Sequence, residues 1–545
     1  MKINLVMLSN GKSGLSWPLG EIYQVQPNAF AVSECITKYL ENSPADAWLF
    51  WDSNLGLPNS DLNQFLVNNS IDVWHAGLKL GMGGQPDFID FVSPTWMLNR
   101  DPDPEIAATS WRLSLRACLI RCEVLRQLGG PRDDFLSLEA AGLELGHRYI
   151  QNGVFMRYVP GLLQTYPQSP TPEIPLQDQL LFLKARYGSK WMYWAAGLAL
   201  LTGRTSTKKL ASALVKVKSI SIPSARKVYH HKCEASERLT GKEKVSVLIP
   251  TINRYPYLRV LLGQLQKQSV APHEILIIDQ TPAQDRDAKL LDEFPDLPIK
   301  WFTLEKAGQC SSRNFGLQNA EGDFVLFLDD DDEILPDLIE RHLENLRQNR
   351  CNVSNGVALE PGMNSLPDDF TFLRLSDVFP TNNSMIKKAV LKRSGLFDLA
   401  YDHGQRADGD LGMRIYLSGE KMVLNPDISI LHHHAPQGGL RTHKARVDTY
   451  AQSRSSVSHF NLLTVSDLYL AKRYFTDSQV RERKFINLLG TFSLHGSRWH
   501  KVAKAVVALF SLPKNLHTLN KRSKIADQWL QTYPQIPFDQ AGDLP

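Results

Sequence analysis

Short apolar runs alternate with amphipathic segments most regularly between about residues 244 and 445. Runs of β-branched and other apolar residues predict buried strands at 245–250, 274–279, 299–304 and 324–328. Leucines at helical spacing predict a helix over 257–268, and a second helix is predicted over 310–320. This alternation indicates an α/β fold with a parallel sheet and right-handed crossovers.

Two of these strands end in aspartates. Asp279 ends the strand at 274–279, and Asp329 to Asp332 follow the strand at 324–328. Ligands of such sheets bind beyond the carboxyl ends of the strands. Adjacent carboxylates repel one another, so a site that holds four of them usually contains a cation. Mg²⁺ and Mn²⁺ prefer carboxylate oxygen and commonly bridge to phosphates. The alternative is a solvated turn that leads into the helix at Pro336.

Further polar residues follow along the same segment. Asp408 stands just before an apolar helix, where a carboxylate either caps the helix or acts from a rigid mount in catalysis. Three histidines, His432 to His434, follow a strand over 427–430 and either contribute a metal ligand or form a surface cluster. Arg313 either contacts a diphosphate or is a solvated helix residue.

In combination these motifs resemble the family 2 glycosyltransferases, which have the GT-A fold, a Rossmann-like nucleotide-sugar-binding domain. The resemblance spans residues 244 to about 440, a little over a third of the chain. Its motifs are Val247-Leu248-Ile249-Pro250-Thr251-x-Asn253-Arg254, Ile277-Ile278-Asp279, Gly308 with Ser312-Arg313-Asn314, Leu328-Asp329-Asp330-Asp331-Asp332, and Asp408-x-Asp410-Leu411-x-x-Arg414.

The resemblance implies a role for each matching position. The donor nucleotide sugar would be held by Pro250, Thr251, Arg254, Asp279, Arg313, Asp329 and Asp330. A divalent ion, Mn²⁺ or Mg²⁺, would be held by Asp331 together with His432 or His434. Asp408 stands where the family keeps its catalytic base, although Ala407 replaces the usual preceding glutamate. The family inverts the anomeric centre in a single displacement.

An internal repeat links the N-terminal part of the chain to this segment. Residues 119–129 match 385–395 at one fixed offset, which also aligns Leu145 with Leu411. We therefore predict a tandem duplication. The two copies differ at the positions for chemistry: Gly142, Tyr166 and Asn54 replace Asp408, His432 and Asp331, whereas Asp52 and Glu144 stand for Asp329 and Asp410. The first copy also has room for fewer strands, so we expect it to be inactive.

The length of 545 residues exceeds what one hydrophobic core supports, so several domains are expected. We predict a degenerate, truncated GT-A-like domain over 1–166, a helical, basic linker over 167–243, the catalytic GT-A domain over 244–445, and a C-terminal helical extension over 446–545. A hydrophobic content of 43% with 22% charged residues is that of a folded globular protein and excludes disorder of the whole chain.

Composition also narrows the partners and the compartment. A net charge of +4 is too small to indicate nucleic-acid binding, and none is expected. The six cysteines form no C-x-x-C pair, which argues against a disulfide framework or a zinc site. The start of the chain lacks the pattern of a signal peptide, and no apolar run approaches the roughly 18 residues of a membrane span. We therefore expect a cytoplasmic protein.

Peripheral contact with the inner face of the membrane is a further expectation. An aromatic cluster at Trp191, Met192, Tyr193 and Trp194 is followed by basic residues from Arg204 through Lys242. Aromatic residues beside Lys and Arg are typical of helices that lie in an anionic interface. The alternative is that the aromatic residues pack between the two copies.

The leading hypothesis is the metal-dependent, inverting transfer of a sugar from a nucleoside-diphosphate sugar to a hydroxyl acceptor, on a glycan or a lipid-linked molecule, in surface or extracellular polysaccharide synthesis. Two alternatives stay open. A nucleotidyltransferase shares the acidic strand end but needs neither Asp408 nor the histidines. A non-catalytic carbohydrate-binding or scaffold protein of a polysaccharide assembly complex would fit the degenerate first copy.

Overall fold

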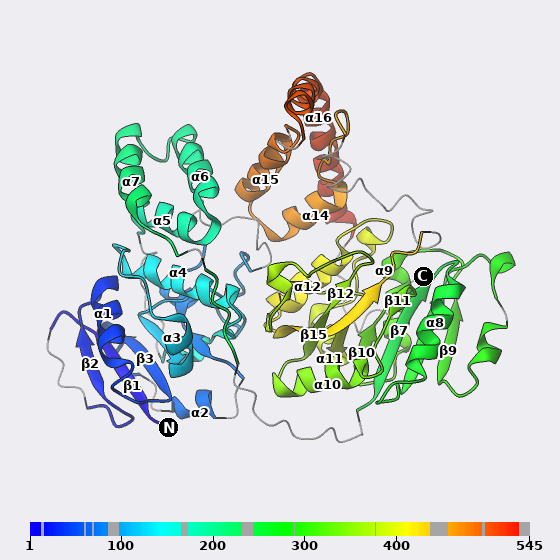
Figure 1. Ribbon diagram of the computed structural model, residues 1–545, viewed down its shortest axis with the longest axis horizontal. Coiled ribbons are helices and arrows are strands. Elements are labelled where there is room, and N and C mark those ends of the chain that lie inside the picture. The colour runs from blue at the N-terminus through cyan, green and yellow to red at the C-terminus, as the bar shows by residue number, and fades with distance from the viewer. Residues whose placement is uncertain are drawn as a thin grey trace.

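The computed structural model describes residues 1–11, 16–58, 61–67, 70–84, 98–164, 173–223, 225–231, 243–287, 289–376, 378–436, 456–492 and 496–533. These residues form two sheets that lie side by side, and two groups of helices rise from the same side of the sheets (Figure 1). Tyr166 and the expected boundaries at 166/167 and 445/446 lie outside the described residues.

The first sheet has the strand order β2-β1-β3-β5-β4-β6. Its strands are β1 (Ile3–Leu8), β2 (Ile22–Val25), β3 (Ala47–Asp52), β4 (Val73–His75), β5 (Ala117–Arg121) and β6 (Met156–Tyr158). The helices of this half are α1 (Ala29–Tyr39), α2 (Asn63–Leu66), α3 (Cys122–Leu128), α4 (Leu138–Gln151), α5 (Leu176–Tyr187), α6 (Ser189–Leu201) and α7 (Thr207–Ser219).

The second sheet has the order β11-β15-β12-β14-β10-β7-β8-β9, and β13 pairs with β15. Its strands are β7 (Val245–Thr251), β8 (Glu274–Asp279), β9 (Ile299–Thr303), β10 (Phe324–Phe327), β11 (Asp332–Glu333), β12 (Val353–Leu359), β13 (Arg374–Leu375), β14 (Ser384–Lys387) and β15 (Met422–His432). The accompanying helices are α8 (Tyr255–Leu265), α9 (Gln309–Asn319), α10 (Leu338–Gln348), α11 (Lys388–Ser394), α12 (Ala407–Leu417), α14 (Val465–Tyr474), α15 (Asp477–Leu489) and α16 (Arg498–Thr532).

The predicted parallel arrangement holds for the four strands that the apolar runs indicate. β7 pairs in parallel with β8 and β10, and β8 with β9. β14 instead runs antiparallel to β10 and β12, so the sheet as a whole is mixed. The leucines of α8 face the core as expected, because Leu258, Leu261 and Leu262 are fully buried.

The two sheets repeat the same pattern of strand pairing. β3 pairs antiparallel with β5 in the register Ala47↔Arg121, and β10 pairs antiparallel with β14 in the register Phe324↔Lys387. β4 and β12 each pair antiparallel with the next strand on one side and parallel on the other. In the described residues, the first sheet lacks counterparts of β9 and β11. The repeat in the sequence is thus matched by a repeat in topology.

The correspondence extends to the helices that follow each sheet. In the first half Arg148 is ion-paired with Glu144 at 3.1 Å, and Arg186 of α5 approaches the same carboxylate at 3.6 Å. In the second half Arg414 pairs with Asp410 at 2.9 Å, and Arg473 of α14 approaches it at 3.4 Å. Among the described residues, each sheet is therefore followed by a group of three helices, the first of which carries near its end an arginine that reaches the equivalent buried acid. The helices α5–α7 correspond in this way to α14–α16.

The aromatic cluster of α6 lies between these helical groups. Met192 is buried, and the Trp194 indole donates a hydrogen bond to Glu482 of α15 at 2.9 Å. Trp194 also packs on Phe485, with ring centroids 5.7 Å apart. Of the two roles left open for this cluster, these contacts favour packing between the copies. No helix within the described ranges is long and apolar enough to cross a membrane.

Direct contacts also join the two halves near their sheets. The Lys421 ammonium donates to the Ser70 hydroxyl at 2.6 Å, and that hydroxyl donates to the carbonyl of Asn349 at 2.5 Å. The Tyr416 hydroxyl donates to the carbonyl of Arg100 at 2.8 Å. The first half thus contacts α12 and the residue that precedes β15.

Candidate functional site

A cavity of about 170 Å³ opens at the carboxyl ends of β7, β8 and β10. It lies where a parallel α/β sheet binds ligands. Six residues predicted for the site line it, and they are Pro250, Thr251, Arg254, Arg313, Asp329 and Asp330. Sequence reasoning did not single out the other three lining residues, Ile252, Gln280 and Gln309.

Asp330 is the centre of a buried polar network at the wall of this cavity. It accepts hydrogen bonds from the Thr251 hydroxyl at 2.8 Å and from the Arg254 guanidinium at 2.9 Å. Burial raises the pKa of Asp330 to about 7, against the opposing effect of Arg254. Asp330 therefore depends on positive charge to stay ionised, and Arg254 supplies it.

Asp331 lies behind this wall and is buried. Its Oδ2 accepts from the Ala435 backbone N–H at 2.7 Å, and its Oδ1 lies 3.2 Å from Arg254 and 3.7 Å from His432. Oδ1 accepts no hydrogen bond from any residue that the structure describes. An ionised oxygen in this state is available to a further positive ligand.

His432 brings the end of β15 to the acidic cluster. Its Nδ1 lies 2.8 Å from the Asp332 carboxylate. Asp332 is the residue paired with His432 in the antiparallel register of β11 and β15. Burial by itself lowers the pKa of His432, but the hydrogen bond to Asp332 and the nearby charges of Asp329 and Asp331 outweigh it and raise the pKa above its usual range. The His434 ring packs edge-on against that of His432, with centroids 4.3 Å apart, and its Nε2 lies 2.9 Å from the Glu360 carboxylate.

A helix N-terminus and an arginine form the opposite wall. The Arg313 guanidinium of α9 donates to Asp329 at 2.8 Å. Gln309, the first residue of the helix, lines the cavity, and Gly308 precedes it. A Cβ on Gly308 would lie 2.1 Å from the Asp402 carboxylate, so this close approach requires glycine. The backbone N–H groups of Cys310 and Ser311 donate to the Asp402 carboxylate at 2.8 Å, so this carboxylate caps the helix and Arg313 is the positive group at this wall.

Asp279, predicted to hold the nucleoside, is not at the cavity surface. It is fully buried and accepts from the Tyr255 hydroxyl at 2.8 Å and from the backbone N–H of Thr281 at 2.9 Å. Its chain neighbour Gln280 reaches the cavity instead and accepts a hydrogen bond from the Gly308 N–H at 2.6 Å.

Asp408 and Asp410 occupy very different environments on the first turn of α12. Asp408 is exposed and accepts from the backbone N–H of Gly409 at 2.8 Å. Asp410 is fully buried between Arg414, Arg473 and the Tyr474 hydroxyl, which donates to it at 2.7 Å. The loop before α12 contacts α9, since the Gln309 amide donates to the carbonyls of Tyr401 and Gly404. Asp408 is thus an accessible acid on a helix whose preceding loop contacts Gln309 of the cavity, and Asp410 is held inside the fold.

These residues suit a hard divalent cation in their chemistry. The His432 imidazole of β15 lies 3.7 Å from the Asp331 carboxylate and 2.8 Å from that of Asp332 of β11, and Asp331 Oδ1 has no hydrogen-bond donor within the described part of the chain. In the structure Arg254 and His432 supply the positive charge. The described residues contain no group of three or more His, Cys, Asp or Glu side chains already arranged around a metal position.

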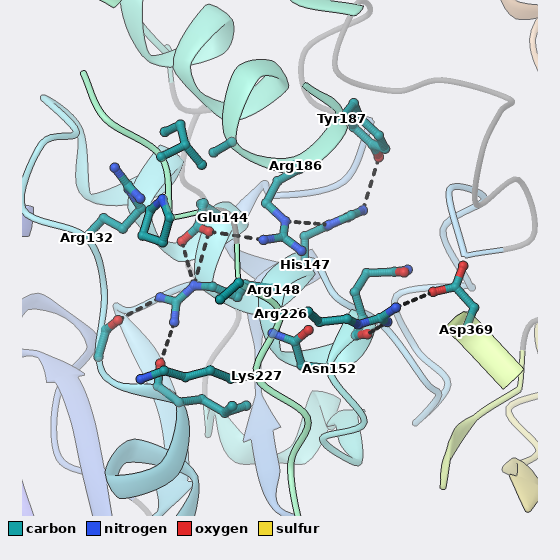
Figure 2. A pocket seen from close by; sticks show the side chains of 17 residues that line it. Arg132, Glu144, His147, Arg148, Asn152, Arg186, Tyr187, Arg226, Lys227 and Asp369 are labelled. Carbon is teal, nitrogen blue, oxygen red and sulfur yellow. Dashed lines mark hydrogen bonds and ion pairs between the residues drawn. The ribbon is translucent and has the colours of Figure 1, made fainter. Parts of the chain in front are cut away.

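A pocket of the first half lies around Glu144, the counterpart of Asp410, and not at the ends of the strands (Figure 2). A cavity of about 620 Å³ lies beside α4 and α5, and Glu144 is ion-paired there with Arg148 and Arg186. His147 is buried and accepts from the Arg186 guanidinium at 3.1 Å. At the end of β3, Asp52 is ion-paired with Arg116 at 2.7 Å and is followed by Ser53 and Asn54 in place of further aspartates.

Comparison with known proteins agrees with this geometry. The family model described as Glycosyl transferase family 2 matches residues 246–392, which contain β7 to β14 and the acidic cluster. These residues are a glycosyl transferase family 2 domain. The predicted resemblance and the α/β, GT-A fold class are thereby confirmed for this part of the chain.

Curated relatives of the family 2 domain are bacterial. The chain is 38% identical over 99 residues to "Uncharacterized glycosyltransferase YwdF" of Bacillus subtilis, which covers 18% of this chain and 36% of that protein. It is 31% identical over 120 residues to "GalNAc(5)-diNAcBac-PP-undecaprenol beta-1,3-glucosyltransferase" of Campylobacter jejuni, which covers 22% of this chain and 39% of that protein. The chain therefore spans just over a third of the length of these relatives.

Two further matches are longer but more distant. "Glycosyltransferase GlyG" of Streptococcus pneumoniae is 24% identical over 276 residues, which cover 45% of this chain and 87% of that protein. The crystal structure of S. aureus TarS residues 1–349 in complex with UDP-GlcNAc is 17% identical, with a TM-score of 0.35, and covers 53% of this chain and 92% of that one.

Proposed function

We propose that the family 2 domain transfers a sugar from a nucleoside-diphosphate sugar to a hydroxyl acceptor, with inversion and with a divalent metal ion. The observation that carries the proposal is the cavity at the carboxyl ends of β7 and β10, where Arg254 and Arg313 meet the acidic cluster within the family 2 domain.

Donor binding is assigned to the two walls of the cavity. Pro250, Thr251 and Gln280 line the side at the ends of β7 and β8, which suits a nucleoside. The Arg313 guanidinium faces Asp329 and offers donors to a diphosphate. Asp279 does not contact the nucleoside in this proposal. It fixes the positions of Tyr255 and Thr281 by accepting their hydrogen bonds behind the nucleoside side of the cavity. The metal is assigned to Asp331 and His432, with His434 as the neighbour of His432.

The reaction needs charge stabilisation at the donor and a base at the acceptor. A bound Mn²⁺ or Mg²⁺ would stabilise the negative charge that develops on the diphosphate as the sugar departs. Asp408 is an exposed carboxylate on a rigid helical turn, so it is our candidate to accept the proton of the acceptor hydroxyl. A single displacement needs only two carboxylates: one that binds the metal ion, and one that accepts the proton of the acceptor hydroxyl.

The acceptor and the pathway are proposed at the level of class. The Campylobacter jejuni relative is named for a glycan on a diphosphate-linked polyprenol. We propose a glycan or lipid-linked acceptor for this chain too, in the synthesis of surface or extracellular polysaccharide, with transfer taking place in the cytoplasm.

We further propose that residues 1–166 are a catalytically silent copy of the GT-A domain. The support is the shared strand pairing together with the loss of the acidic cluster after β3. The ion pair Glu144–Arg148 has the same i,i+4 spacing as Asp410–Arg414. The first copy has therefore kept interior contacts of the fold while it has lost residues of the site. Its contacts with α12 and with the residue that precedes β15 indicate a scaffolding role.

If the first copy is silent, removing its remaining strand-end acid should not affect transfer. We expect Asp52→Asn to change the transfer rate by less than about twofold, because asparagine can still cap the turn at Asn54 and no carboxylate follows Asp52 in that turn to hold a metal. Asp329→Asn is the matched variant in the second copy and should be strongly impaired. Steady-state rates of both variants measured with the same donor decide the point. A large loss in Asp52→Asn would show that the first copy is a second enzyme.

A panel of nucleotide sugars with Mn²⁺ tests the proposed function as a whole. Release of nucleoside diphosphate, with sugar transferred to acceptor or to water, is the expected result. Release of pyrophosphate would instead indicate a nucleotidyltransferase. Binding of sugars without turnover of any donor would indicate a carbohydrate-binding or scaffold protein.

A further inference from the structure

The long helix α16 carries its apolar stripe on the outside. Its inner face is formed by residues such as Lys504, Ala508, Asn515 and Leu519, which are buried. The exposed apolar side chains recur at helical spacing on its first half, at Trp499, Val502, Val506, Leu509 and Phe510. The two aromatic residues are 84% and 82% exposed. A stripe of this kind, with two aromatic side chains almost wholly in water, marks an interaction surface.

The equivalent helices of the first half end in a similar way. The end of α6, where the chain turns toward α7, exposes Leu200 and Leu201, the latter by 83%, and α7 exposes Val215 by 73%. Since α5–α7 correspond to α14–α16, the protein presents two comparable helical projections. Both rise from the same side of the sheets (Figure 1).

The sequence around the apolar residues of α16 and around those of α6 and α7 carries only positive charge. From Arg498 to Ala526 the sequence contains seven Lys and Arg residues and no Asp or Glu. The segment 189–219, which forms α6, α7 and their connection, contains six basic residues and no acidic one. Exposed basic side chains are also close in sequence to the apolar ones, with Arg498 and Lys501 near Trp499, and Arg204, Lys208 and Lys209 following Leu201.

We infer that the first half of α16 and the α6–α7 turn together dock the protein on an anionic lipid bilayer. Trp499, Phe510 and Leu201 would enter the boundary between head groups and acyl chains, while the neighbouring Lys and Arg side chains meet the lipid phosphates. A second copy of this chain is a poor occupant of the same surface, because it would bring like charges together. The surface differs from the one expected from the sequence, since Trp194 and Met192 are committed to packing inside the protein.

The experiment is sedimentation of the full chain with vesicles at low salt. Vesicles of phosphatidylcholine and phosphatidylglycerol are compared with vesicles of phosphatidylcholine alone. We expect at least about tenfold stronger partitioning onto the anionic vesicles, reduced by salt, since each basic residue near such a surface contributes severalfold. Absence of binding to anionic vesicles at low salt overturns the inference.

Variants separate the apolar from the charged contribution. Trp499→Ser/Phe510→Ser should reduce partitioning by about tenfold or more, because two large side chains no longer insert. Lys208→Glu/Lys209→Glu should remove the preference for anionic lipid. Val260→Ser, a substitution of a half-exposed side chain on α8, is the matched control and should bind like the unaltered protein. Aromatic variants that bind vesicles normally contradict the inference.

Two additional readouts distinguish membrane docking from misfolding and from self-association. Circular dichroism should show unchanged helix content in all variants, because each altered side chain is exposed. Light scattering in the absence of lipid should show no assembly that depends on Trp499 and Phe510; such an assembly would mean that a second copy covers the stripe. Nucleotide binding by the family 2 domain should be the same in every variant, so failure of membrane docking and failure of the proposed catalysis are distinguished.

Discussion

Asp331→Asn is expected to lower sugar transfer by about 10³-fold or more and to abolish the effect of Mn²⁺ on nucleotide affinity. Asp331 is the carboxylate whose Oδ1 lies between Arg254 and His432 without a hydrogen-bond donor in the described chain. Replacing it by a neutral amide removes charge from the place assigned to the metal, and metal stabilisation of a leaving diphosphate is a large part of such a barrier. Calorimetry of nucleoside diphosphate, with Mn²⁺ and with chelator, measures the binding effect directly.

The conservative change is chosen because Asp331 is buried. Asparagine keeps the shape and can still accept the hydrogen bond from the Ala435 N–H, so the melting temperature should change little compared with the effect on transfer. Asp292→Asn, at an exposed carboxylate in the segment between β8 and β9, is the control and should behave like the unaltered protein. An active Asp331→Asn enzyme, or one whose nucleotide affinity still responds to Mn²⁺, would refute the metal assignment.

The second large effect is expected at Asp408. Asp408→Asn should reduce transfer by about 10²- to 10⁴-fold while leaving donor binding unchanged, because an amide cannot take the proton of the acceptor hydroxyl. The side chain is exposed and makes only one hydrogen bond, to its neighbour Gly409, in the described structure, so the fold should not be affected. Single-turnover transfer with saturating donor separates this loss from a binding defect.

Asp410→Asn provides the contrast to Asp408→Asn two residues away. Its carboxylate is buried among Arg414, Arg473 and Tyr474, and its neutralisation would leave the buried Arg414 without the carboxylate it pairs with, whereas Arg473 keeps its ion pair with Asp398. We expect a loss of stability of about 3–5 kcal/mol, seen in chemical denaturation. A stable Asp410→Asn protein without transfer, together with a nearly normal Asp408→Asn protein, would place the base at Asp410 instead.

Much of the catalytic half could be predicted because its signals are local. The strands at β7, β8 and β10 are buried on both faces and therefore appear as continuous apolar runs, and the leucines of α8 repeat at helical spacing. The aspartates follow such a strand directly, so their place at the edge of the sheet follows from the topology. Six of the predicted site residues do line one cavity.

The rest depends on contacts between distant parts of the chain. The pairing of β11 with β15 sets Asp332 opposite His432, and no pattern within either segment encodes this register. Asp279 is withdrawn from the cavity by Tyr255, a residue of α8, and Gln280 takes its place. The antiparallel direction of β14 and the position of Trp194 against α15 are likewise settled by tertiary packing. The periodicity of apolar residues predicts which side chains are buried, but it does not predict which distant residues they contact.

The correspondence of the helical groups is also hidden in the sequence. Residues 167–243 have the composition of a linker, because Pro-rich turns and basic residues dominate them. Their relation to α14–α16 becomes visible only when Arg186 and Arg473 are seen at the equivalent buried acid in the two halves. The domain boundaries themselves stay predictions.

The position of Mn²⁺ in crystals grown with the nucleoside diphosphate of the active donor tests the proposed metal-dependent transfer most directly. We expect an anomalous peak within about 2.5 Å of a carboxylate oxygen of Asp331 and in contact with the diphosphate, with the nucleoside against Thr251 and Gln280. A peak bound only at other residues, or a nucleotide bound beside β3 in the first half and absent from the cavity at β7 and β10, would contradict the assignment.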